Sequence, residues 1–157
     1  MSTTTSARTH APAATPQIDP RGAQFAAGLT SIVLALVLLT LPSVLAGVLL
    51  ALQTALFAVG ASRGVQHTPW SWVFRTLVRP RLAPPSELED ARPPRFAQAV
   101  GLAFAGVGLL GLLAGSTAVA AVATGFALVA ALLNAVFGLC LGCELYLVLA
   151  RLRHRPA

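Results

Sequence analysis

The two cysteines of the chain, Cys140 and Cys143, lie three residues apart in the segment LCLGCELY, residues 139–146. On a helix this spacing places their Cα atoms roughly 5 Å apart, which a disulfide can span. Glu144 lies four residues after Cys140, so the three side chains share one face of a helix. Such a thiol pair exchanges with a partner's disulfide or persulfide, one thiolate attacking and the other resolving the intermediate. Cys140 and Cys143 are therefore candidate catalytic residues, with Glu144 as a candidate proton acceptor.

Two other interpretations fit the same spacing. Free cysteine behaves as a small hydrophobic residue, and together with Gly138 and Gly142 the pair would let helices pack closely. Two thiolates also bind zinc or copper, but a closed site needs more ligands, from His67, His154 or a second copy of the chain. The spacing alone leaves redox exchange, packing and metal binding open, and we assign no metal ligand.

The composition predicts a membrane protein. Of the 157 residues, 56% are hydrophobic and 10% are charged, and the mean hydropathy is +0.77, whereas soluble domains carry roughly a quarter charged residues. Four uncharged runs are long enough to cross about 30 Å of hydrocarbon. We therefore predict an all-α, polytopic fold in which four transmembrane helices form two hairpins. The predicted membrane domain covers residues 20–152, with spans at 23–41, 43–62, 97–114 and 117–139 and an interfacial helix at 141–152.

The distribution of charge predicts the orientation. The chain has no lysine, and all eleven arginines lie outside the four predicted spans. The turns at residues 42 and 115–116 carry none. Because positive charge marks the cytoplasmic side, we predict a multi-pass protein of the cell membrane with both termini and the central loop, residues 63–96, in the cytoplasm. Residues 1–19, rich in Thr, Ala and Pro, predict a disordered tail, and residues 153–157 form a basic tail.

The central cytoplasmic loop contains a predicted interfacial helix. Thr68 and Pro69 suit its start, as a capping residue and a first-turn proline. Trp70, Phe74 and Leu77 then fall on one face, and arginines on another. This pattern predicts a helix at the membrane surface, with Trp at headgroup depth and Arg towards anionic lipid. Docking of a soluble partner on the basic surface is the alternative.

Both predicted hairpins open with similar residues. PRGAQFAAGL begins at Pro20 and PRFAQAVGL at Pro94, sharing Pro-Arg-x-Ala-Gln and then Gly-Leu. A duplication would relate the two halves by an axis along the membrane normal. Proline at a helix start and arginine reaching the headgroups produce such a likeness independently as well. In either case Arg21 and Arg95 are predicted at the inner membrane interface.

Polar residues within the predicted spans are few. Gln53 and Asn134 are the two deepest amides, and we predict that they meet across the bundle. The spans hold no row of carboxylates or arginines, which argues against an ion pathway. The chain also has no glycine-rich phosphate loop, no metalloprotease histidine pair and no plausibly placed Ser-His-Asp set. No cofactor and no nucleic-acid partner is therefore expected.

Three segments resemble an uncharacterised bacterial membrane family, the domain-of-unknown-function family 4395: IDPRGAQFAAGLT, FRTLVRPRLAPPSELEDARPPRFAQAVGLAFA and LNAVFGLCLGCELYLVL. The likeness runs from Ile18 to Leu152, and Cys-Leu-Gly-Cys-Glu is its most specific part. Members have four predicted spans and often carry Phe where Leu139 stands here. The family has no settled activity, but its members are often found beside thioredoxin-like and rhodanese-type sulfurtransferase proteins. The resemblance implies that Cys140 and Cys143 handle electrons or sulfur.

These observations lead to two hypotheses of different class. The first is a membrane protein whose cytoplasm-facing dithiol exchanges electrons or sulfur with a thioredoxin-like or rhodanese-type partner. The second is a non-catalytic membrane scaffold in which the cysteine pair only packs helices. The sequence leaves open whether the protein is an enzyme, whether it forms a homo-oligomer, and whether a quinone is involved.

Overall fold

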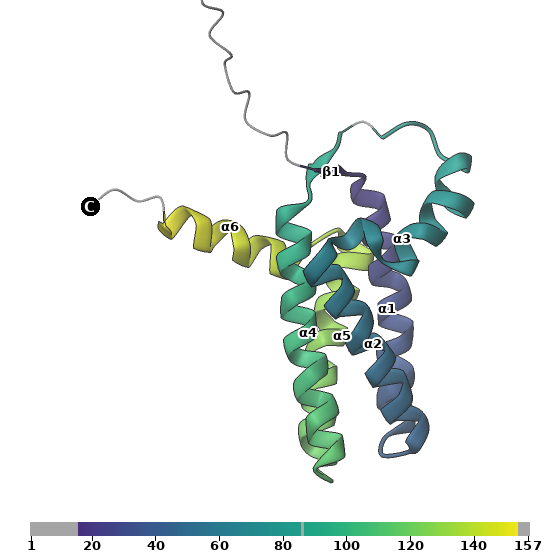
Figure 1. The fold of residues 1–157 in the computed structure, drawn as a ribbon, viewed down its shortest axis with the longest axis vertical. Helices are drawn as coiled ribbons and strands as arrows, with labels where there is room; N and C mark the ends of the chain where they lie inside the picture. Colours follow the sequence, from purple (N-terminus) through teal and green to yellow (C-terminus); the bar gives the residue numbers. More distant parts are fainter. Residues whose placement is uncertain (1–15, 86, 154–157) are drawn as a thin grey trace, which may run out of the picture.

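The computed structural model describes residues 16–85 and 87–153, most of which are helical. Four long helices run side by side as two hairpins (Figure 1). Each is long and apolar enough to cross a membrane. The predicted all-α, polytopic fold with four membrane spans is thereby confirmed. The four helices are α1 (Pro20–Thr40), α2 (Val44–Arg63), α4 (Arg92–Leu113) and α5 (Thr117–Phe137).

Local residues explain where the hairpins turn. Pro42 has no backbone N–H and therefore cannot continue α1. Ser43 and Ser116 begin α2 and α5, and each side chain accepts a hydrogen bond from the backbone N–H three residues later. Gly115, between α4 and α5, has a φ of 78°, a conformation that favours glycine. Both turns are therefore specified by the residues within them.

The four helices pack around a narrow core. α1 lies against α2 and α5, and α4 lies against the same two helices. Leu34 and Leu50 are fully buried at the centre. Gly108 allows α4 to approach α5 closely, because a Cβ there would lie 3.1 Å from the Thr124 hydroxyl oxygen. Many large apolar side chains on the outer faces are exposed, as expected for helices that face lipid.

The two ends of the bundle differ in charge. The central loop and the helix that follows α5 lie at one end, which we call the arginine end, and the two hairpin turns lie at the other (Figure 1). Residues 42 and 115–116, in the turns, include no arginine. The arginines of the described residues flank the arginine end of the bundle: Arg21, Arg63, Arg75, Arg79, Arg81, Arg92, Arg95, Arg151 and Arg153.

The central loop contains the predicted helix. The Thr68 hydroxyl caps it by accepting a hydrogen bond from the Ser71 N–H at 3.4 Å. Phe74 is only 3% exposed and its ring lies 5.8 Å from that of Phe25 on α1, so this face packs on the bundle. Trp72 is 61% exposed. The loop elements are η1 (Val65–His67), α3 (Pro69–Val73), the π-helical η2 (Phe74–Val78) and η3 (Arg79–Arg81).

Two short strands join the chain before α1 to the segment before α4. β1 (Gln17–Ile18) pairs antiparallel with β2 (Glu89–Asp90). Arg21 forms an ion pair with Asp19 at 3.0 Å and donates a hydrogen bond to the Ala83 carbonyl oxygen at 3.1 Å. Of the predicted tails, residues 1–15 and 154–157 lie outside the described residues, whereas residues 16–19 lead through β1 into α1.

Candidate functional site

The end of α5 determines where the cysteines lie. Gly138 has a φ of 69°, in the left-handed region that favours glycine, and its N–H donates to the Asn134 carbonyl oxygen at 3.0 Å. This bond is that of an αL-type helix end, and the N–H of Leu139 also donates to the Leu133 carbonyl oxygen at 3.2 Å. The helix therefore stops at Phe137, and the span that the sequence extends to residue 139 is two residues shorter.

A second helix, α6 (Leu141–Arg153), begins immediately after Cys140. Cys140 therefore lies just outside the helix, and Cys143 lies in its first turn. The N–H of Cys143 donates to the Cys140 sulfur at 3.3 Å, and the N–H of Glu144 donates to the Cys140 carbonyl oxygen at 3.0 Å. Cys140 thus occupies the capping position of α6, where a side chain can satisfy a free N–H group.

The two cysteines form a disulfide, with their Cα atoms 5.2 Å apart. This separation agrees with the helical spacing expected for residues three apart, although only Cys143 is within the helix. Both side chains are half-buried at the arginine end. Glu144 is exposed, and its carboxylate makes no hydrogen bond to either cysteine within the described part of the chain. Its role as proton acceptor stays a prediction.

Close packing holds the start of α6 against α4. A Cβ atom on Gly142 would lie 2.6 Å from both Cα and Cβ of Ala97, so only glycine allows this approach. One turn further along, the rings of Tyr146 and Phe96 lie 5.8 Å apart. The remainder of α6 projects sideways from the bundle (Figure 1). The disulfide is consequently held in a defined position beside α4.

A cavity of about 520 Å³ begins at the disulfide and extends between the four long helices. Both cysteines line it, as do residues from the central loop. Its polar lining includes four amides, from Gln24, Gln53, Gln98 and Asn134. The sequence singled out Gln53 and Asn134, and both line this cavity, but among the described residues no hydrogen bond joins them. The cavity itself was not predicted, because it depends on how the four helices pack.

Trp70, whose ring the sequence predicts at headgroup depth, lines this cavity. Its indole N–H is buried and donates no hydrogen bond within the described residues. The depth of the ring in the membrane stays a prediction. The repeated Pro-Arg-x-Ala-Gln motif was a usable signal for part of this lining, since Gln24 and Gln98 are its two glutamines. No sequence pattern predicted that residues of α3, such as Trp70, line the cavity.

The described residues contain no group of three or more His, Cys, Asp or Glu side chains that could hold a metal ion. His67, one of the two histidines considered as an additional ligand, is exposed. His154, the other, lies outside the described residues. The geometry brings together the two thiols but adds no third ligand from the described part of the chain.

Comparisons with known proteins agree with the resemblance that the sequence suggested. The profile of the family described as domain of unknown function, DUF4395, matches residues 18–151. No curated protein and no solved structure matches the chain. The matched region includes all four long helices and the disulfide. This chain, a membrane protein with four apolar helices and a close cysteine pair, therefore belongs to the DUF4395 family.

Proposed function

We propose that the protein is a membrane-bound thiol–disulfide exchange protein whose partner is a soluble thioredoxin-like or rhodanese-type protein. The observation that carries this proposal is the Cys140–Cys143 disulfide at the start of α6, half-buried beside a cavity. Two thiols at a helix start can form and break a disulfide with little movement of the backbone. A pair that only packs helices has no need of this arrangement.

The position of Cys140 favours a particular direction of attack. In the exchange step a partner thiolate attacks the sulfur of Cys143, the Cys143–partner disulfide forms, and Cys140 leaves as a thiolate. The Cys143 N–H, 3.3 Å from the Cys140 sulfur, and the positive end of the α6 dipole stabilise this thiolate. A more stable thiolate leaves faster. A second partner thiolate then displaces Cys143, which leaves two thiols in this protein and a disulfide in the partner.

A rhodanese-type partner would use the reduced pair. The Cys140 thiolate attacks the outer sulfur of the partner's persulfide, takes that sulfur over and releases the partner thiolate. The Cys143 thiolate then attacks the inner sulfur of the Cys140 persulfide. This step re-forms the disulfide and releases hydrosulfide. The same two residues therefore serve electron transfer and sulfur transfer, and the partner decides which reaction occurs.

A trapping experiment tests the exchange. The oxidised protein in lipid nanodiscs is mixed with a thioredoxin that keeps only its attacking cysteine, and peptide mapping locates the mixed disulfide. We expect the adduct predominantly on Cys143. In cells, Cys140→Ser and Cys143→Ser variants are expected to retain a thioredoxin-like or rhodanese-type protein through the remaining cysteine. The double variant is the matched control and should retain none.

The opposite results would support the scaffold hypothesis. If no mixed disulfide forms with either single variant and the double variant grows like wild type under oxidative and sulfur stress, the exchange proposal fails. An adduct predominantly on Cys140 would contradict the assignment of Cys140 as leaving group.

We place the arginine end in the cytoplasm. The nine arginines that flank this end and the lack of arginine in the hairpin turns support this orientation, because positive charge is retained on the cytoplasmic side. A reporter that is active only in the cytoplasm, fused after Ala157, should be active, and a periplasmic reporter should be silent. The reverse result would contradict this orientation.

A further inference from the structure

The cavity between the four helices contains buried polar groups for which the described residues provide no partner. Gln53 on α2 is 1% exposed, and its Oε1 accepts no hydrogen bond. Trp70 lines the same cavity, and its indole N–H is likewise buried without an acceptor. Burying such groups unpaired is costly. The residues that line this cavity therefore include one with an unpaired acceptor and one with an unpaired donor.

The polar groups lie at two depths. Gln24 and Gln98 lie near the arginine end: the Gln24 amide nitrogen is 2.7 Å from where a Cβ of Gly138 would be, and Gln98 lies similarly close to Gly60. Gln53 is seven residues before Gly60 on α2, about 10 Å further along the axis than the level of Gln98. A ligand that reaches from the disulfide to Gln53 therefore lies among membrane-spanning helices, where a lipid-soluble molecule is favoured.

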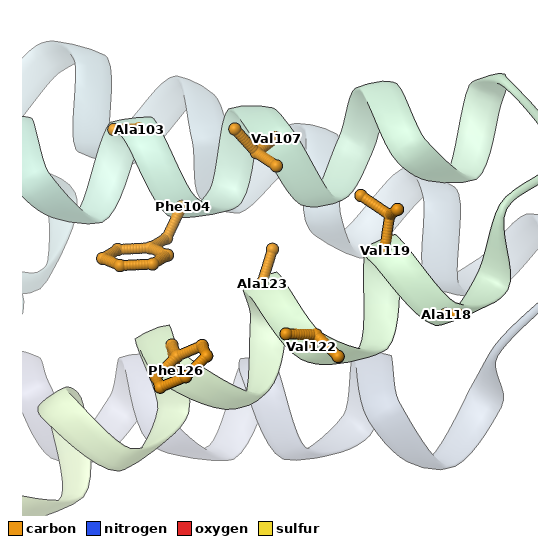
Figure 2. A pocket seen from close by; sticks show the side chains of 8 residues that line it. All are labelled: Ala103, Phe104, Val107, Ala118, Val119, Val122, Ala123 and Phe126. Atoms are coloured by element: carbon orange, nitrogen blue, oxygen red, sulfur yellow. The ribbon is translucent and has the colours of Figure 1, made fainter.

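An apolar groove on the lipid side lies next to this cavity. An apolar groove on the outer face of α4 and α5 is lined by Ala, Val and Phe side chains only (Figure 2). Phe104 from α4 and Phe126 from α5 line both the groove and the cavity, and their ring centroids are 5.9 Å apart. The two rings form the boundary between the groove and the cavity. A molecule with its polar head in the cavity and its apolar tail in the groove would pass between these two rings.

We propose that the cavity binds the headgroup of a membrane quinone, which the Cys140–Cys143 dithiol reduces. This inference rests on the proposed exchange function, because the dithiol must first be produced by a partner. The two carbonyl oxygens of a quinone accept hydrogen bonds from donors such as the Trp70 N–H. The hydroxyl groups of the quinol donate to acceptors such as Gln53 Oε1. A cavity of about 520 Å³ is within the size range of small-molecule sites.

The electrons and protons of this step balance. The two thiols lose two electrons and two protons as the Cys140–Cys143 bond forms. The quinone takes up both, and its carbonyl oxygens become the hydroxyl groups of the quinol. The quinone is itself the oxidant, so no further reactant is needed. Each cycle moves two electrons from the thiols of the soluble partner to the membrane carrier.

Quenching of tryptophan fluorescence tests binding directly, because the chain has only two tryptophans. The Trp72→Phe/Cys140→Ser/Cys143→Ser variant keeps Trp70 as its single fluorophore and is placed in lipid nanodiscs. Titration with a ubiquinone that carries one isoprene unit should quench Trp70 saturably. Adding Gln53→Leu should raise the Kd about tenfold. Adding Gln66→Leu instead is the matched control. Gln66 also has a buried Oε1 without a hydrogen-bond partner, but Gln66 does not line the cavity. Its Kd should stay within about twofold.

Two results would overturn the site. Quenching of the parent variant that rises linearly with quinone, without saturation, would show simple partitioning into lipid, and this measurement needs no change at Gln53. Equal Kd values for the parent and the Gln53→Leu variant would show that the quinone binds elsewhere.

Electron transfer is tested separately, with the reduced protein that keeps both cysteines. Mixing it with the same quinone should remove one quinone per dithiol, measured by the loss of quinone absorbance, and Gln53→Leu should slow the reaction about tenfold. Saturable binding without reduction overturns the redox assignment. The results also tell the two proposals apart. If a partner is trapped but no quinone binds, the quinone site is wrong and the exchange function stands. If the dithiol reduces quinone but no partner is trapped, the exchange function is wrong and the quinone site stands.

Discussion

The two hairpins of the bundle have corresponding parts that differ in one chemical respect. After α2, Gly64 has a φ of 97°, and Thr68 then caps a helix by accepting the N–H of Ser71 at 3.4 Å. After α5, Gly138 has a φ of 69°, and Cys140 caps a helix by accepting the N–H of Cys143 at 3.3 Å. Both capping residues and the two residues whose N–H groups they accept line the same cavity. One hairpin thus presents two hydroxyl groups where the other presents two thiols.

The correspondence continues into the packing. Six residues after Thr68, Phe74 packs against Phe25 on α1; six residues after Cys140, Tyr146 packs against Phe96 on α4. A turn–cap–helix unit returns in each case to the first helix of its own hairpin. The comparison shows that this architecture positions a pair of side chains on the cavity wall whatever their chemistry. Only the sulfur pair can form a covalent bond and carry electrons, so the second hairpin is the one we expect to react.

The largest expected effect separates the two pairs directly. The Cys140→Ser/Cys143→Ser variant should lose all ability to oxidise a reduced thioredoxin, because no disulfide can form. The Thr68→Ala/Ser71→Ala variant should retain the rate within about twofold. It should lose about 1 kcal/mol from the Thr68 cap and about 1 kcal/mol from each hydroxyl that donates to the Val65 carbonyl oxygen. Thioredoxin oxidation in nanodiscs and unfolding in detergent measure the two quantities. A comparable loss of rate in the Thr68→Ala/Ser71→Ala variant would show that the hydroxyl pair also takes part in the reaction.

A smaller effect is expected from the contact that holds the thiol pair in place. Gly142→Ala should destabilise the protein by about 2 kcal/mol and slow exchange, because the new Cβ would lie 2.6 Å from Ala97 and push α6 away from α4. Gly125→Ala is the control, since a Cβ there meets no atom within 4 Å and alanine favours the helix. Unfolding in detergent measures both. A neutral Gly142→Ala would mean that α6 is not held against α4.

The smallest effect concerns the start of the first hairpin. Hydrogen bonds from the Arg21 side chain lower the pKa of Asp19 below its ordinary value. A carboxylate with a lowered pKa in the folded state stabilises the protein above its unfolded pKa of about 3.9, and this contribution is lost as the pH falls through the folded pKa. Asp19→Asn should remove this loss of stability at acid pH. Near neutral pH it should lower the free energy of unfolding by about 1 kcal/mol or less. Unfolding measured from pH 7 down to about pH 2 tests it, because the loss occurs below the unfolded pKa.

The control for this prediction lies at the start of the second hairpin. Asp90 accepts a hydrogen bond from the Arg92 N–H at 2.9 Å but is exposed and forms no ion pair within the described residues. Asp90→Asn should therefore leave the acid-dependent loss unchanged. An identical pH profile for wild type and Asp19→Asn would contradict the assignment of this dependence to Asp19.

Most of the fold follows from local properties that can be read in the sequence. Long uncharged runs specify four apolar helices because burying unpaired backbone in lipid is prohibitive. Pro42 and the serines that follow it and Gly115 define the turns through steric and capping effects. The capping position of Cys140 was less predictable. Whether the helix ends at Gly138 depends on the packing of the segment that follows, and the start of α6 packs against Ala97.

By itself, the sequence determined the membrane class of the protein, the order of its helices and the presence of one thiol pair, because hydropathy, capping and residue identity act over a few neighbouring residues. The tertiary structure alone decided that Gln24, Gln53, Gln98 and Trp70 surround one cavity beside that pair, since these residues come from four different segments. Such a cavity is formed by contacts between residues far apart in the chain, and no local pattern encodes them.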